Sequence, residues 1–266
     1  MRNAALTILA VGLVLALAGA ASAAVTTVAL YHMGEDGDNP NVKLIAAVGT
    51  DAAMGSWNNT ESIETGTTGA LGSTKYLSND RSAWTPGLTY LYNRANNWGM
   101  SAWLKLPDGP LAGQQYVSDS WWAMSNGNYN ANSIGMSRPN GVTTWNIGHG
   151  DIVAVDPALY GTWAHVALVY NGNNNAQLYV NGELLGSRAT NASFRGDAAG
   201  HFWIGTWNAN SNVGRGAKGY DEVQVFSFDA GQFDISDVYK INIPEPATMS
   251  LLVIGGVAAL IRRRRK

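Results

Sequence analysis

Alternating apolar and polar positions, rather than apolar residues at helical spacing, dominate the middle of this 266-residue chain. Residues 163–170 are bulky and β-forming, residues 171–175 form a turn cluster of Asn and Gly, and an alternating segment resumes at residues 177–180. The Asn-Gly pair at 181–182 then provides two residues that tolerate positive φ in a type I′ turn. The pattern predicts a three-stranded antiparallel meander.

The N-terminal end has a different pattern. A short positive start is followed by an almost wholly apolar stretch over residues 4–20 and by a small-x-small sequence that contains Ala21 and Ala23. This order is typical of a secretory signal peptide with a cleavage site at those alanines. We therefore expect residues 1–23 to be a signal helix read by the Sec machinery, and residues 24–242 to fold as one exported domain.

The C-terminal end combines Pro244, Glu245 and Pro246 with an apolar run over residues 247–261 and five final cations. A helix of these 15 residues reaches roughly 22 Å, which is less than the ~30 Å hydrocarbon core of a bilayer. The cations resist transfer across a membrane, so we expect a short membrane helix whose C-terminus stays in the cytoplasm. The two prolines keep the sequence before this helix extended and accessible to a protease.

This order resembles the PEP-CTERM sorting signal, whose Pro-Glu-Pro motif is processed by an exosortase, a membrane-embedded cysteine transpeptidase-like enzyme. Pro244, Glu245 and Pro246 match the motif, and Ala247 completes its frequent form. The alternative is an ordinary tail anchor with a Pro-rich junction. The resemblance implies that residues 243–266 are a sorting signal, that an exosortase is a partner, and that the protein reaches the surface or extracellular matrix of a Gram-negative bacterium.

Composition limits what the segment between the two ends does. Without Arg2 and the terminal cations, 11 of the 17 basic residues remain, and without Glu245, 18 of the 19 acidic ones, so the net charge is about −7. Such a surface, without a basic stripe, excludes nucleic acid as a partner and favours divalent cations or neutral sugars. The absence of cysteine excludes disulfides and thiol catalysis.

The meander is part of a longer pattern. The sequence Gly-Thr-Trp-Ala-His-Val-Ala-Leu-Val-Tyr at 161–170, followed by Leu-Tyr-Val-Asn-Gly at 178–182, resembles the laminin G-like, concanavalin A-like jelly-roll family. The family's opening strand, early core strand, late strand, last strand and closing turn are matched by residues 31–35, 99–105, 202–205, 219–226 and 233–239. The resemblance implies an all-β fold, a two-sheet antiparallel jelly-roll sandwich of roughly a dozen strands.

Aromatic and amide residues provide candidates for ligand binding. Trp121 and Trp122 are adjacent, so on a strand they point to opposite faces and cannot both enter one core. The loop after them, residues 125–132, contains four Asn and one Tyr, a mixture of amide and aromatic groups that stacks on sugar rings and binds their hydroxyls. The candidate residues for an extracellular glycan or protein ligand are Trp121, Trp122, Asn126, Asn128, Tyr129 and Trp207. The alternative is a loop that only covers core tryptophans.

The family resemblance also implies a structural Ca²⁺ between the first and last strands. The ligands would be oxygen donors suited to a hard cation: Glu35, Asp36, Asp38 and Asp221. In the alternative interpretation residues 36–38 form a turn and Asp221 accepts hydrogen bonds from backbone groups. The four histidines lack paired ligand spacing, and we interpret them as structural.

Motifs for catalysis are not found in the sequence. Asp221 and Glu222 are adjacent and so point to opposite faces, unlike the facing carboxylates of a glycanase, and there is no Gly-x-Ser-x-Gly, His-Glu-x-x-His or phosphate loop. We interpret the chain as a noncatalytic surface or matrix protein that binds extracellular glycan or protein. Two alternatives remain open, a structural matrix component without a ligand and a glycoside hydrolase or lyase.

Overall fold

The structure is a computed structural model. It describes residues 25–33, 55–56, 62–65, 69–73, 75–78, 83–85, 97–110, 121–125, 133–137, 141–148, 150–171, 175–189, 202–204 and 217–239. The chain divides into two units, Ala24–Tyr239 and a second unit of Met1–Ala23 with Lys240–Lys266, and all described residues belong to the first. Within those residues no helix has the length and apolar character needed to span a membrane. The predicted signal and C-terminal helices lie outside them.

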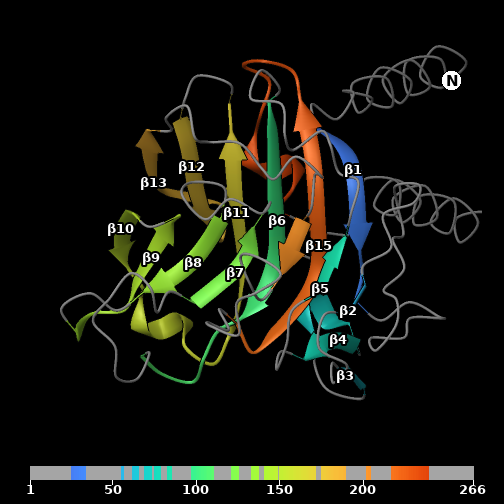
Figure 1. The fold of residues 1–266 in the computed structure, drawn as a ribbon, viewed down its shortest axis with the longest axis vertical. Coiled ribbons are helices and arrows are strands. Elements are labelled where there is room, and N and C mark those ends of the chain that lie inside the picture. Colours follow the sequence, from blue (N-terminus) through green and yellow to red (C-terminus); the bar gives the residue numbers. More distant parts are fainter. Residues whose placement is uncertain are drawn as a thin grey trace, which may run out of the picture. The chain divides into compact units, whose positions relative to one another are not determined.

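Two antiparallel sheets form the unit Ala24–Tyr239 (Figure 1). The first sheet has the order β13 (Glu183–Ala189), β12 (Asn175–Val180), β11 (Trp163–Tyr170), β6 (Trp98–Lys105), β15 (Gly219–Phe228), β4 (Lys75–Ser78) and β3 (Ser62–Thr65), with β1 (Val25–Tyr31) also paired to β15. The second has the order β10 (Gly150–Ala154), β9 (Thr144–Ile147), β8 (Ser133–Ser137), β7 (Trp121–Ser125), β14 (Phe202–Ile204), β5 (Ala83–Thr85) and β2 (Gly55–Ser56). This arrangement confirms the all-β, two-sheet antiparallel sandwich.

The three-stranded meander is confirmed as β11, β12 and β13. Asn181 and Gly182 connect β12 to β13 with φ values of 50° and 84°, as a type I′ turn requires, and Val180 pairs with Glu183 across it. β12 begins at Asn175, earlier than the predicted start at residue 177.

Three of the strands expected from the family resemblance lie where the sequence predicted them, as β6, β14 and β15. The opening strand begins earlier than predicted, because β1 covers Val25–Tyr31 and residues 32–33 follow it. Its position is fixed by pairing with β15, from Val25 opposite Phe228 to Tyr31 opposite Val223. Met33 has a φ of 55°, which ends the extended backbone.

Both faces of the first sheet are buried, which explains why β11 is an almost continuous apolar run. One face packs in the main core between the sheets, where alternate residues of β11 contact the second sheet. The other face carries a smaller cluster beneath the segment that follows β15 and contains the short 3₁₀ helix η6 (Ile235–Asp237). That cluster consists of Val169, Phe226, Phe228 and Val238, with Val25, Tyr179, Phe233 and Ile235 packed against it.

Candidate functional site

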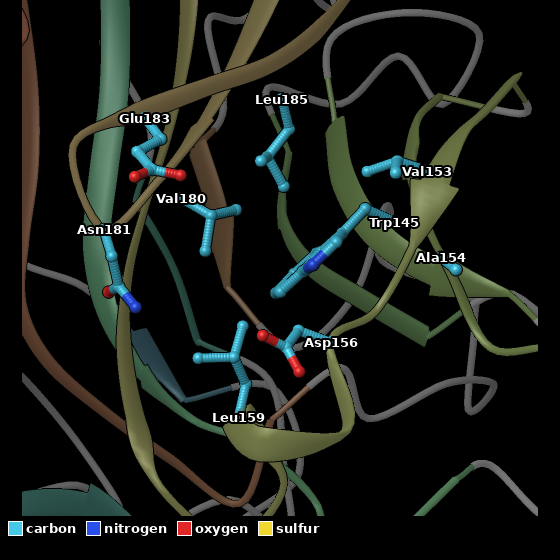
Figure 2. A pocket seen from close by; sticks show the side chains of 9 residues that line it. All are labelled: Trp145, Val153, Ala154, Asp156, Leu159, Val180, Asn181, Glu183 and Leu185. Carbon is cyan, nitrogen blue, oxygen red and sulfur yellow. The ribbon is translucent and has the colours of Figure 1, made fainter.

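A pocket of about 290 Å³ lies between the two sheets, next to the turn from β12 to β13 (Figure 2). Figure 1 shows the edge strands β10 and β13 on the same side of the sandwich, and these two strands are in contact. The pocket is lined by Trp145, Val153, Ala154, Asp156, Leu159, Val180, Asn181, Glu183 and Leu185. Small-molecule sites usually occupy roughly 300–1,000 Å³. This pocket lies at the small end of that range, so its size suits a ligand of about one sugar ring.

One wall of the pocket is built by the 3₁₀ helix η5 (Pro157–Leu159). Asp156 is its N-cap: Oδ1 accepts a hydrogen bond from the backbone N–H of Ala158 at 2.9 Å, and Pro157 at the first helical position has the φ that the helix needs. This single turn places Leu159 in the wall. The second carboxylate oxygen of Asp156 has no hydrogen-bond partner in the described part of the chain.

The opposite wall is held by the type I′ turn. The backbone N–H of Asn181 donates to the carbonyl of His165 at 2.8 Å, and Oδ1 of Asn181 accepts from the N–H of His165 at 2.9 Å. The Nδ2 group of Asn181 is left without a partner among the described residues. Glu183, the first residue of β13, places an exposed carboxylate on the same wall.

Trp145 forms the floor of the pocket. Its side chain is 0 % exposed, and its Nε1–H has no hydrogen-bond partner among the described residues. In Figure 2 the indole ring reaches into the space bounded by Asp156, Leu159 and Leu185. A buried N–H without a partner costs about 1–3 kcal/mol. Because Nε1 is covered by protein atoms, this donor is out of reach of a ligand in the pocket, and Trp145 supports the floor as an apolar ring.

The pocket is negatively charged. Asp156 and Glu183 are its ionisable residues, and no Lys, Arg or His is among the described residues that line it. Four of its apolar residues, Trp145, Val180, Leu159 and Leu185, surround a common space in Figure 2. The site can therefore receive a polar ligand with an apolar face.

Asp221, a predicted calcium ligand, is fully buried in β15. Its Oδ2 accepts hydrogen bonds from the Ala70 N–H at 2.9 Å and the Ser73 hydroxyl at 2.6 Å, and its Oδ1 accepts one from the Glu222 N–H at 3.0 Å. Burial raises the pKa of Asp221 to about 6, although the hydrogen bond from Ser73 acts in the opposite direction. These contacts match the alternative in which Asp221 binds backbone groups.

The described residues by themselves do not form a calcium site. They contain no group of three or more His, Cys, Asp or Glu side chains able to hold a metal ion. Glu35, Asp36 and Asp38 lie outside the described residues. Calcium binding therefore stays a prediction.

Glu222 and the described histidines have structural partners. Glu222 has a φ of 49° at a bulge in the pairing of β15 with β6, and its Oε1 lies 2.7 Å from Nδ1 of His32. His165 is 2 % exposed and packs against the rings of Trp103 and Tyr239 at 5.6 and 5.3 Å. Burial lowers the pKa of His165 to about 4. His149 and His201 are outside the described residues.

The other residues predicted to bind or to be processed are not tested. β7 contains Trp121 and Trp122, but nothing is described of their side chains. The remaining candidates lie wholly outside the described residues: Asn126, Asn128, Tyr129, Trp207, Ala21, Ala23, Pro244, Glu245, Pro246 and Ala247. The pocket was not predicted from the sequence, in which its local signals are the Asn-Gly turn at 181–182 and the Asp-Pro helix start at 156–157.

Comparisons with known proteins agree with the fold. Residues 77–235 match the model of the concanavalin A-like lectin/glucanases superfamily, and residues 242–266 match the PEP-CTERM protein-sorting motif. No curated protein matches the sequence.

Several solved structures are similar to the chain. Domain 4 of AbnA, an extracellular arabinanase of Geobacillus stearothermophilus solved with arabinotriose, is 15% identical with a TM-score of 0.50, covering 81% of this chain and 99% of that domain. The botulinum neurotoxin serotype D binding domain is 15% identical (TM-score 0.50, 80% and 51% covered). The ligand-binding domain of the same serotype, solved with N-acetylneuraminic acid, is 14% identical (TM-score 0.50, 80% and 49% covered).

The chain spans about half the length of these two toxin domains, and at such identities the likeness shows the fold alone. The family match, by contrast, covers more than half of the 266 residues. The chain therefore belongs to the concanavalin A-like lectin/glucanases superfamily and carries a PEP-CTERM sorting motif at its C-terminus.

Proposed function

We propose that this exported protein is processed by an exosortase and binds an extracellular glycan in the pocket between its sheets, without cleaving the glycan. The observation that carries the proposal is the composition of the pocket: an indole and aliphatic side chains on the floor, with an amide and two carboxylates on the walls. Apolar surface suits the C–H face of a sugar ring, and the polar groups suit its hydroxyls. The arabinotriose and N-acetylneuraminic acid complexes support this use of the fold.

The sorting motif supports the proposed location. A Pro-Glu-Pro sequence before a short apolar run and a cationic end is consistent with a domain outside the inner membrane and a cytoplasmic C-terminus until processing. The domain would then reach the surface or extracellular matrix of a Gram-negative bacterium, where polysaccharides are abundant ligands.

A glycan array with the full-length exported protein, purified in mild detergent, tests the proposal. Ala154 is exposed and lines the pocket, so Ala154→Phe fills it, whereas Ala189→Phe adds the same bulk at an exposed residue of β13 outside it. We expect the wild type and Ala189→Phe to bind the same glycans and Ala154→Phe to lose them. An array without any bound glycan would favour a structural component without a ligand, and unchanged binding by Ala154→Phe would place the site elsewhere.

A glycoside hydrolase is the second candidate, because Asp156 and Glu183 both line the pocket. Two observations favour binding instead. Both carboxylates are exposed, whereas a general acid that works near neutral pH is usually desolvated, and Asp156 already caps η5. An assay of new reducing ends on polysaccharides decides between the two: activity that Asp156→Asn or Glu183→Gln abolishes would replace the binding proposal.

A further inference from the structure

We infer that the pocket selects a sugar with a free ammonium group, such as a glucosamine residue of an extracellular polysaccharide. This inference rests on the proposed function, because it takes the ligand to be a glycan. It concerns the chemical class of that glycan.

The charge of the pocket walls is the first observation that favours an ammonium group. Asp156 has one carboxylate oxygen that accepts no hydrogen bond from the described residues, and neither oxygen of Glu183 accepts one. No described cation lines the pocket to compensate the two charges. An ammonium group has three N–H donors and no acceptor, so it supplies both the hydrogen bonds and the charge that these walls lack.

The floor carries the second step, since it distinguishes a sugar from a simple amine. The aliphatic side chains of Leu159, Val180 and Leu185 face the same space and suit the C–H face of a sugar ring. A simple amine has no such ring to place against them. An apolar ring face together with an ammonium group is the pattern of an amino sugar.

The same features act against two related sugars. N-acetylation removes the positive charge and adds three heavy atoms in a pocket of only about 290 Å³. A uronic acid brings a carboxylate toward Asp156 and Glu183, and the net charge of about −7 on the chain without its two ends repels acidic polymers at longer range. The expected order of affinity is amino sugar, then neutral or acetylated sugar, then acidic sugar.

Calorimetric titration of the full-length protein in detergent tests this order. The probes are a glucosamine oligomer, the fully N-acetylated oligomer of the same length, an oligouronate and spermidine, at about pH 6 so that the amines are protonated. We expect the glucosamine oligomer to bind about tenfold more tightly than the acetylated one and to lose affinity as salt is added. The oligouronate and spermidine should bind more weakly than either.

The variants keep the shape of the pocket and change its charge. Glu183→Gln and Asp156→Asn each remove one carboxylate, and Asn at 156 still caps η5 because Asn is a good N-cap residue. Asp229→Asn makes the same charge change at an exposed residue outside the pocket. We expect each pocket variant to lower the preference for glucosamine by about threefold, and Asp229→Asn to leave it unchanged.

The outcomes separate the two proposals. If no glycan binds, the proposed function fails. If acetylated and free oligomers bind equally, or if the preference in both pocket variants is as large as in the wild type, the glycan function stands and the amino-sugar inference is overturned. Spermidine binding as tight as that of the glucosamine oligomer would also overturn it, because the site would then recognise an ammonium group without the sugar.

Discussion

Asp221 is a buried carboxyl group whose charge the fold opposes. Burial raises its pKa from the ordinary value of 3.8 to about 6. Between these two pH values the folded protein keeps a proton on Asp221 that the unfolded chain releases. Its contribution to stability is thus present below the ordinary pKa and lost as the pH rises through about 6. We predict that, from about pH 4 to pH 7, the wild type loses about 2–3 kcal/mol of unfolding free energy relative to Asp221→Asn.

Urea unfolding of both proteins across this range measures the difference. Asn cannot accept the Glu222 N–H with its amide nitrogen, so the variant also has a constant cost of about 1–3 kcal/mol. That cost does not change with pH. Parallel pH curves for the two proteins would contradict the prediction.

The effect of His165 on stability changes with pH in the opposite direction. Burial lowers its pKa from 6.5 to about 4, so the folded protein keeps the ring neutral while the unfolded chain takes up a proton below about 6.5. Its contribution to stability is present above that value and is lost as the pH falls toward 4. His165→Phe keeps a ring against Trp103 and Tyr239 and cannot ionise. We predict that the variant lacks an acid-induced loss of about 3 kcal/mol that the wild type shows in the same unfolding series.

The two residues act in overlapping pH windows and in opposite directions. Between about pH 4 and pH 6 the wild type gains stability from Asp221 and loses it from His165 as the pH falls. A flat pH profile of the wild type would therefore conceal both contributions. Only the single variants separate them, and an unchanged slope for His165→Phe would show that its ring is not desolvated in solution.

At the scale of elements, the turn between β12 and β13 links the pocket wall to the last described segment. Gly182 has a φ of 84°, and a Cβ there would lie 2.7 Å from Cδ1 of Tyr239. Gly231 has a φ of 75°, and a Cβ there meets no atom within 4 Å. Alanine is strained by about 1–2 kcal/mol in this conformation at either position, but only Gly182→Ala also displaces an aromatic ring.

We therefore predict that Gly182→Ala lowers the unfolding free energy by about 1–3 kcal/mol more than Gly231→Ala does. Thermal unfolding of the two variants beside the wild type gives the comparison. Because the two φ values are similar, the backbone strain of alanine is about the same in both variants and cancels in the difference between them. Equal destabilisation by both substitutions would mean that Tyr239 moves away at little cost.

The elements that the sequence predicted correctly are those with local signals. The β11 to β13 meander follows from β-forming runs and an Asn-Gly pair, and both are read within about twenty residues. β1 was misplaced because its position depends on pairing with β15, from Val25 opposite Phe228 to Tyr31 opposite Val223. The pocket could not be predicted for the same reason: Trp145 and Glu183 meet only when the two sheets close. Contacts between segments far apart in the chain produce no periodic pattern of apolar and polar residues in the sequence.

At the scale of the whole molecule, the predicted calcium site has a consequence for stability. An ion that binds only the folded state raises the melting temperature by mass action. If Glu35, Asp36, Asp38 and Asp221 bind Ca²⁺ as the family resemblance implies, the full-length protein melts at a higher temperature in calcium than in EDTA, and Asp221→Asn removes the difference. Equal midpoints in calcium and EDTA would contradict the site.

The sorting tail makes the last prediction, because its three features have separable roles. Pro244, Glu245 and Pro246 are the expected processing signal, whereas the apolar run and the five cations set membrane insertion and orientation. Replacing the three motif residues with alanine leaves the insertion features intact. We predict that this variant is exported, stays in the membrane fraction and keeps its C-terminal residues, while the wild type and the neighbouring Asn242→Ala control lose them. Mass spectrometry of the membrane and surface fractions provides the measurement, and a motif variant trimmed like the wild type would show that processing does not depend on Pro-Glu-Pro.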